Sequence, residues 1–88
     1  MTDRLDEIRI KTFTVYRRGD ISDTHDENQW TGPNEPQFDG VVFPDGSCIL
    51  RWCAGVGSTS VWASADDAFA IHGHPEARYG TEIVWHDR

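Results

Sequence analysis

The chain has 88 residues, a length that allows one folded domain, residues 1–88, with a single hydrophobic core. Its formal net charge of −7 opposes binding to nucleic-acid phosphates or anionic membranes, because both attract clusters of Lys and Arg. The N-terminal residues contain no apolar run of signal-peptide length, and no later run is long enough to span a bilayer, so we expect a soluble, cytoplasmic protein.

A first strand is predicted over residues 8–18, where β-branched and aromatic residues are interleaved with cations. The alternation is imperfect, because Ile8 and Ile10 share a parity with Tyr16 whereas Phe13 and Val15 take the other. A bulge, or burial on both faces near the middle of the strand, would account for this change of parity.

Residues 19–39 form an acidic segment that holds six Asp and Glu residues and no Lys or Arg. Its Pro and Gly residues predict an irregular loop, and a loop of this length in a compact domain is usually functional or disordered. Trp30 lies within it, and a large aromatic side chain there predicts either an anchor to the body of the domain or a contact site. The candidate partner-binding residues are therefore Asp20, Asp23, Asp26, Glu27 and Trp30.

The chain from Gly40 onward predicts a three-stranded meander. Two strands, residues 41–43 and 47–52, flank a tight turn in which Pro44 sets φ and Gly46 supplies a positive φ. A glycine-containing connection leads to a third strand over residues 58–63. Cys48 and Cys53 fall on opposite faces of the second strand of the hairpin, so we expect two free, partly buried thiols.

A helix of about two turns is predicted after Ser64, which can cap its N-terminus, while Gly73 and Pro75 end it. Its apolar stripe should dock Phe69 and Ile71 on the sheet. A last strand follows over residues 81–86, and we expect Trp52, Trp62 and Trp85 to pack in the core with Phe69. The order of elements predicts an α+β fold, an antiparallel sheet of four to five strands with one short helix packed on a face.

Three histidines suggest an alternative chemistry, because imidazole nitrogens are zinc ligands. They are His72 and His74 at the end of the predicted helix and His86 on the last strand. The paired spacing of known structural zinc sites is missing, and a histidine at a helix C-terminus is favoured without any metal. We expect no cofactor, and no nucleophile elbow or other catalytic motif is present in the sequence.

Four runs carry a resemblance to known proteins. They are Val42-Phe43-x-Asp45-Gly46-Ser47-x-x-Leu50-Arg51-Trp52, Ser58-Thr59-Ser60-Val61-Trp62-x-Ser64-x-Asp66-Asp67, Ile71-His72-Gly73-His74 and Thr81-x-Ile83-Val84-Trp85-x-Asp87. Over about the second half of the chain, this pattern resembles small uncharacterised proteins encoded by actinobacteria and their bacteriophages. The resemblance implies a phage or actinobacterial setting and assigns no catalytic residue.

These observations favour a small binding module that acts on a host protein through the acidic segment and Trp30, without catalysis. The acidic residues would face a basic patch on that protein, or would imitate nucleic acid and compete with DNA for it. Two alternatives stay open from the sequence. One is a metal-binding domain that uses His72, His74 and His86, and the other is a homo-oligomeric structural module, such as a symmetric dimer.

Overall fold

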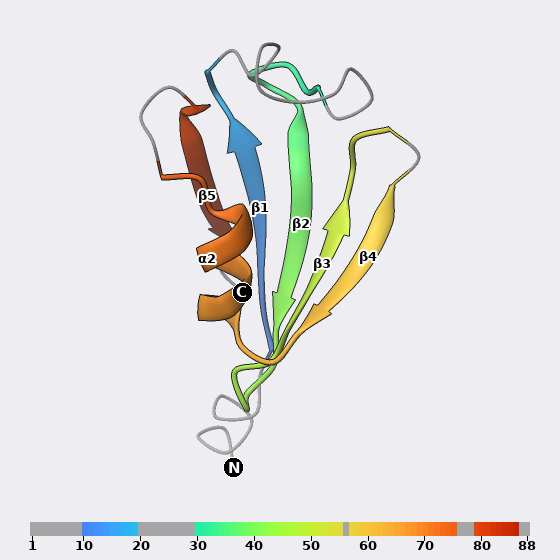
Figure 1. Cartoon of the computed structure of the whole chain (residues 1–88), viewed down its shortest axis with the longest axis vertical. Coiled ribbons are helices and arrows are strands. Elements are labelled where there is room, and N and C mark those ends of the chain that lie inside the picture. The colour runs from blue at the N-terminus through green and yellow to red at the C-terminus, as the bar shows by residue number, and fades with distance from the viewer. Residues whose placement is uncertain (1–9, 20–29, 56, 76–78, 87–88) are drawn as a thin grey trace.

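The structure is a computed structural model, and it describes residues 10–19, 30–55, 57–75 and 79–86. In this part of the chain the elements are β1 (Lys11–Arg17), β2 (Pro36–Val42), β3 (Cys48–Trp52), β4 (Ser58–Trp62), α2 (Ala65–His72) and β5 (Thr81–His86). The strands form one sheet in the order β4-β3-β2-β1-β5, and every neighbouring pair is antiparallel (Figure 1). The predicted α+β fold is confirmed.

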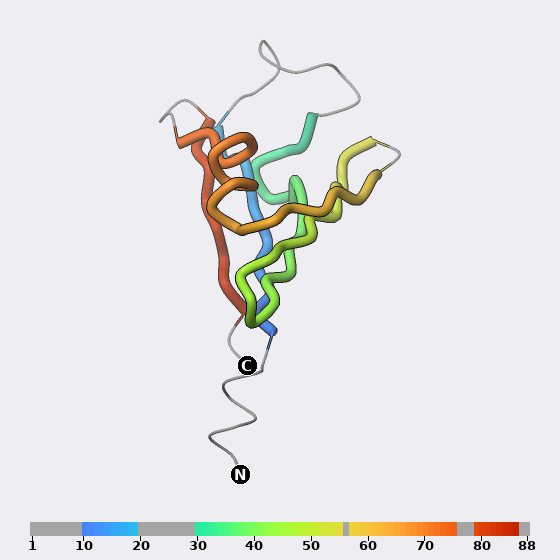
Figure 2. Tube along the Cα trace, turned by 60° about the horizontal axis from the view of Figure 1, so that its bottom comes forward, coloured from blue at the N-terminus to red at the C-terminus, as the bar shows by residue number. Residues whose placement is uncertain are grey.

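The helix lies on one face of the sheet because of how the chain travels between the two edges. β2, β3 and β4 follow one another as a meander, which ends at one edge, whereas β5 lies at the other edge beside β1. The segment that joins β4 to β5 must therefore cross the sheet, and α2 belongs to this segment. Figures 1 and 2 show α2 next to β5. In the part of the chain that the structure describes, no helix has the length and apolar character to cross a membrane.

The core lies between α2 and the face of the sheet that α2 covers. We call this face of the sheet the helix face and the opposite face the open face. The buried apolar residues are Phe13 and Val15 of β1, Phe38 of β2, Cys48 and Leu50 of β3, and Ala68 of α2. Aromatic rings connect the layers, since the Phe13 ring lies 5.3 Å from the Phe69 ring of α2 and 6.5 Å from the Phe38 ring. The Phe69 ring therefore packs the helix on β1.

Gly40 allows the central strands to accommodate the Phe13 ring. The two residues are paired across β1 and β2, and a Cβ atom added to Gly40 would lie 2.0 Å from Cζ of Phe13. No real side chain tolerates such a distance. The ring of Phe13 therefore occupies the space that a side chain at position 40 would need.

The first strand has both features that could explain its imperfect alternation, burial on both faces and an irregular pairing. Phe13, Thr14 and Val15 are buried in succession, so both faces of β1 are covered there, and the pairing register shifts between Val15 and Tyr16. The strand begins at Lys11, and Ile10 before it is exposed. Residues 8 and 9, which the prediction included, lie outside the described residues.

The predicted hairpin turn and the predicted cap at the start of the helix are also confirmed. Oδ1 of Asp45 accepts hydrogen bonds from the backbone N–H and hydroxyl of Ser47, at 2.9 and 2.6 Å, and Gly46 has a φ of +91°. Oγ of Ser64 accepts a 3.1 Å hydrogen bond from the N–H of Asp67, which caps α2. The hairpin turn and the helix start are joined, because the N–H of Ala65 donates to the carbonyl of Gly46.

Three sequence expectations are corrected. β2 begins at Pro36, so Pro36 to Asp39 belong to a central strand and not to the irregular loop predicted over residues 19–39. Phe38 is buried between Val15 and Trp52 in the sheet, and this pairing outweighs the local loop signals of Pro and Asp. On α2, Ile71 is 58% exposed and His72 takes the inward position instead. Trp85 is 47% exposed on the edge strand, although its ring lies 5.0 Å from that of Phe13.

Candidate functional site

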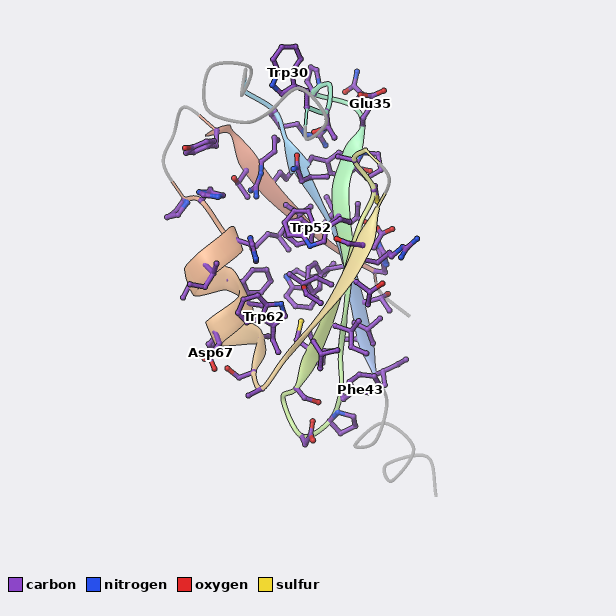
Figure 3. The ribbon with its side chains drawn as sticks, turned by 45° about the vertical axis from the view of Figure 1, so that its right-hand side comes forward. Trp30, Glu35, Phe43, Trp52, Trp62 and Asp67 are labelled. Carbon is purple, nitrogen blue, oxygen red and sulfur yellow. The ribbon has the colours of Figure 1, made fainter. Side chains whose placement is uncertain are left out.

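The described part of the acidic segment presents Trp30 at one end of the sheet. Trp30 is 45% exposed, and Figure 3 shows its ring at the end of the molecule where β2 begins, with Glu35 close by. The residues that follow are ordered by short-range bonds: the N–H of Gly32 donates to Oε1 of Glu35 at 2.6 Å, and Oγ1 of Thr31 donates to Oε1 of Gln37 at 2.9 Å. Trp30 is therefore displayed next to a fixed turn.

The chain at the start of the acidic segment is fixed at the same end. The N–H groups of Arg18 and Gly19 donate to the carbonyls of Gly80 and Tyr79, at 2.8 and 3.0 Å. The guanidinium of Arg18 donates to Oε1 of Glu82 at 2.8 Å and also to the carbonyl of Pro33. Arg18 thus ties the start of the acidic segment both to β5 and to the turn that ends it.

The four acidic candidates themselves, Asp20, Asp23, Asp26 and Glu27, lie outside the described residues. The structure places only their flanks, at Gly19 and Trp30. These two flanks lie at one end of the sheet. Trp30 is the one predicted partner-binding residue whose side chain the structure describes.

Arg17 is a buried cation beside this end of the sheet. Its exposure is 1%, and its guanidinium donates to the carbonyls of His72 and Gly73 and to Oγ1 of Thr81, at 2.8, 3.3 and 2.7 Å. Burial lowers the pKa of Arg17 below its usual range, and Tyr79 opposes this effect. The helix C-terminus carries partial negative charge, so Arg17 stabilises the end of α2 and joins it to β1 and β5.

His72 lies on the helix face against two Trp rings. Its ring is 4.8 Å from that of Trp52 and 5.4 Å from that of Trp62, with both pairs near perpendicular. Burial lowers the pKa of His72 from its usual value, and the neighbouring charges of His74 and Arg17 lower it further. This environment favours the neutral imidazole. His74 follows with a φ of +43°, and its ring lies 4.8 Å from that of Tyr79 at a tilted angle.

His86 lies on the open face, where it belongs to a row of polar side chains that runs from β5 across β1 and β2 to Cys53, the residue after β3. Its Nδ1 and Nε2 are 2.7 and 2.9 Å from the hydroxyl oxygens of Thr12 and Thr14. Oγ1 of Thr14 donates to Oδ1 of Asp39 at 2.7 Å, and Sγ of Cys53 lies 3.7 Å from Oδ2 of the same carboxylate. This row explains why Thr14 is buried, since Asp39 and His86 cover it.

The three histidines of the alternative metal interpretation do not meet. His72 packs on the helix face and His86 on the open face, with the sheet between them. Within the residues that the structure describes, no group of three or more His, Cys, Asp or Glu side chains is placed to hold a metal ion. A site shared by His72, His74 and His86 is therefore not formed.

The thiols differ in their surroundings. Both thiols are free, as expected, but they are not both partly buried: Cys48 is buried in the core and Cys53 is exposed. Desolvation by neighbouring groups raises the pKa of Cys53, and the Asp39 carboxylate raises it further, so little thiolate exists at neutral pH. The row on the open face therefore connects strands and keeps its thiol weakly reactive.

Sequence reasoning missed this polar row and the role of Arg17. Both depend on β1 pairing with β2 on one side and with β5 on the other, strands that lie far from it along the chain. The alternation along β1 marked Thr12 and Thr14 as sharing a face. Nothing in the sequence indicated that His86 and Asp39 would lie beside them.

A comparison with protein families gave a match. The profile of a protein family described as "Acb5 phage protein" matches residues 38–87, which is more than half of the chain. The match begins inside β2 and continues through β5, so it covers most of the sheet and the whole helix. No curated protein and no solved structure matches the chain.

Proposed function

Since this chain belongs to the Acb5 phage protein family, we propose that it is a binding protein through which a phage of actinobacteria engages a host protein in the cytoplasm. The contact surface in this proposal is the acidic segment with Trp30. The function is binding without catalysis, and the sheet and helix serve as the body that carries the surface.

The exposure of Trp30 between fixed flanks supports this proposal most directly. A Trp side chain that leaves 45% of its surface accessible, next to four acidic residues, combines an apolar anchor with charges that select a partner. The turn held by Glu35 and the contacts of Arg18 restrict the chain on both sides of the segment. This restriction lowers the conformational entropy that binding would cost.

The charge of the segment defines the kind of partner. Asp20, Asp23, Asp26 and Glu27 lie within eight consecutive residues that contain no Lys or Arg. Such a run attracts a basic patch, and the attraction weakens as salt shortens the Debye length, which is about 8 Å at physiological ionic strength. Added salt should therefore slow association more than it speeds dissociation.

The experiment is a pull-down from actinobacterial lysate with the tagged protein, repeated at several salt concentrations. One variant carries Asp20→Asn, Asp23→Asn, Asp26→Asn and Glu27→Gln, and a second carries Trp30→Ala. The matched control removes four acidic charges elsewhere, through Asp3→Asn, Asp6→Asn, Glu7→Gln and Asp66→Asn. All variants are first checked for the far-ultraviolet circular dichroism of the wild type.

We expect one host protein to be retained by the wild type and the control and to be lost or strongly reduced with both segment variants. Elution with DNA instead of salt separates a nucleic-acid mimic from an ordinary basic-patch contact. Equal capture by all four proteins at every salt concentration would sink the proposal.

A further inference from the structure

β5 forms an edge of the sheet that leaves apolar side chains exposed on both faces. Among the described residues it pairs only with β1, so its outer backbone groups face no strand in that part of the chain. Ile83, Val84 and Trp85 are 36, 37 and 47% exposed. Ile83 and Trp85 lie on the helix face, and Val84 lies on the open face. An edge of this kind is a template for pairing with another strand.

The other edge of the sheet, β4, is more polar, although its Val61 is 76% exposed. β4 begins with three polar residues, Ser58, Thr59 and Ser60, and the guanidinium of Arg51 donates to Oγ1 of Thr59 at 3.0 Å on the open face. Natural edge strands avoid pairing through charged side chains, prolines or bulges. β5, with the sequence TEIVWH, has no Lys, Arg or Pro, and its one acidic residue is already paired with Arg18.

We propose that β5 pairs in antiparallel fashion with β5 of a second copy of this chain, so that two sheets join into one across a two-fold axis. Side chains opposite each other in such a pair must point to the same side, so the two residue numbers must sum to an even value. The register centred on Val84 meets this condition. It sets Val84 opposite itself, Ile83 opposite the second copy's Trp85, and Glu82 opposite the second copy's His86.

This register makes the strand complementary to itself. Apolar side chains meet apolar side chains at three consecutive positions of the two strands. Two copies that each have a net charge of −7 repel each other. On β5 the negative charge of Glu82 is offset by Arg18, whose Nε lies 2.8 Å from Oε1 of Glu82. A second copy therefore fits this edge better than an acidic or basic partner does.

The strength of the dimer follows from its size. Stable interfaces bury about 1,200–2,000 Å² in total, and an interface formed by a six-residue strand with three apolar side chains is small by comparison. We therefore expect a dimer whose population rises with protein concentration. α2 lies next to β5, and its Ile71 is 58% exposed.

The first test measures mass by sedimentation equilibrium over a wide range of concentration, with Val84→Lys and Val61→Lys as a matched pair. Both positions face the open side, Val84 on the β5 edge and Val61 on the β4 edge. The wild type and Val61→Lys should approach twice the 10.0 kDa of the chain. Val84→Lys should stay at the single mass, because two lysines would face each other at the axis.

The second test does not depend on losing the dimer. In a Cys53→Ser background, where the remaining Cys48 is buried, Val84→Cys or Val61→Cys is introduced and the protein is mildly oxidised. Side chains directly opposite each other in a strand pair lie close enough for a disulfide after small adjustment. We expect a covalent dimer from Val84→Cys and none from Val61→Cys.

Three results would overturn the proposal: a wild type that keeps the single mass at every concentration, a dimer that survives Val84→Lys while the protein remains folded, or cross-linking through Val61→Cys alone. The first of these would leave the edge open to a strand of another protein. The host-protein pull-down does not depend on any of these outcomes.

Discussion

Arg17 and His72 are joined by a 2.8 Å hydrogen bond, in which the guanidinium donates to the backbone carbonyl at the last residue of α2. The same guanidinium reaches the next carbonyl and the hydroxyl of Thr81. One side chain thus connects the first strand, the end of the helix and the start of the last strand. In the described structure its Nε is buried without a hydrogen-bond partner, so this connection also has a cost.

Arg17→Met should lower the free energy of unfolding by about 1–3 kcal/mol, because it leaves carbonyls at the end of α2 without their donor while keeping a similar volume. Urea denaturation followed by Trp fluorescence measures the change. Lys11→Met, at an exposed position of the same strand, is the control and should stay within about 0.5 kcal/mol of the wild type. A stability equal to the wild type would show that the carbonyls find other donors.

Gly40→Ala should destabilise the protein by about 1–3 kcal/mol, because its new methyl group would overlap the Phe13 ring and force the strands apart. Thermal unfolding measures the loss. Combining it with Phe13→Leu, which removes the ring, should cost less than the sum of the two single changes. Strict additivity of the two would contradict the close contact between positions 13 and 40.

The stability of the protein should fall as the pH drops from about 7 toward 5, in part because of His72. Its pKa is lowered in the folded state, so the unfolded chain, with a pKa near its ordinary value of about 6.5, binds the proton first. The contribution of the neutral ring is therefore complete above that value and is lost as the pH falls through the folded pKa. Urea titrations at several pH values give the free energy of unfolding. As the pH falls, this free energy should decrease less steeply for His72→Gln than for the wild type.

Cys53 should react with a thiol reagent in the folded protein, whereas Cys48 should react only after unfolding, because Cys48 is buried. Asp39→Asn should speed the reaction of Cys53 at neutral pH, since the carboxylate helps to raise the pKa of that thiol. Absorbance of the released chromophore gives both rates. Cys53→Ser, with its single core thiol, provides the baseline, and a slower reaction in Asp39→Asn would contradict the stated cause.

The elements that the sequence predicted well are those specified by neighbouring residues. Ser64 caps α2 through the N–H of Asp67, three residues away, and Asp45 holds the hairpin turn through Ser47, two residues away. Such signals act over short stretches of chain and so can be recognised from the residues alone. The strand order β-β-β-α-β in the second half followed from the same local information.

The candidate site was predictable only in part. The composition of residues 19–39 identified the acidic segment and Trp30, but the segment ends earlier than expected because Phe38 enters the core. Phe38 lies in a strand because it pairs with Val15, 23 residues before it in the chain, and with Trp52, 14 residues after it. The same dependence on distant partners explains why His86 was grouped with His72 when it belongs with Thr14.

The sequence by itself determined the class of fold, the hairpin, the capped helix and the concentration of negative charge in one segment. Only the tertiary structure decided which residues meet. It placed β1 between β2 and β5, buried an arginine under the end of α2 and set the histidines on opposite faces. The physical reason is that local propensities act between neighbours in the chain, whereas strand pairing and side-chain packing join residues that are far apart in it.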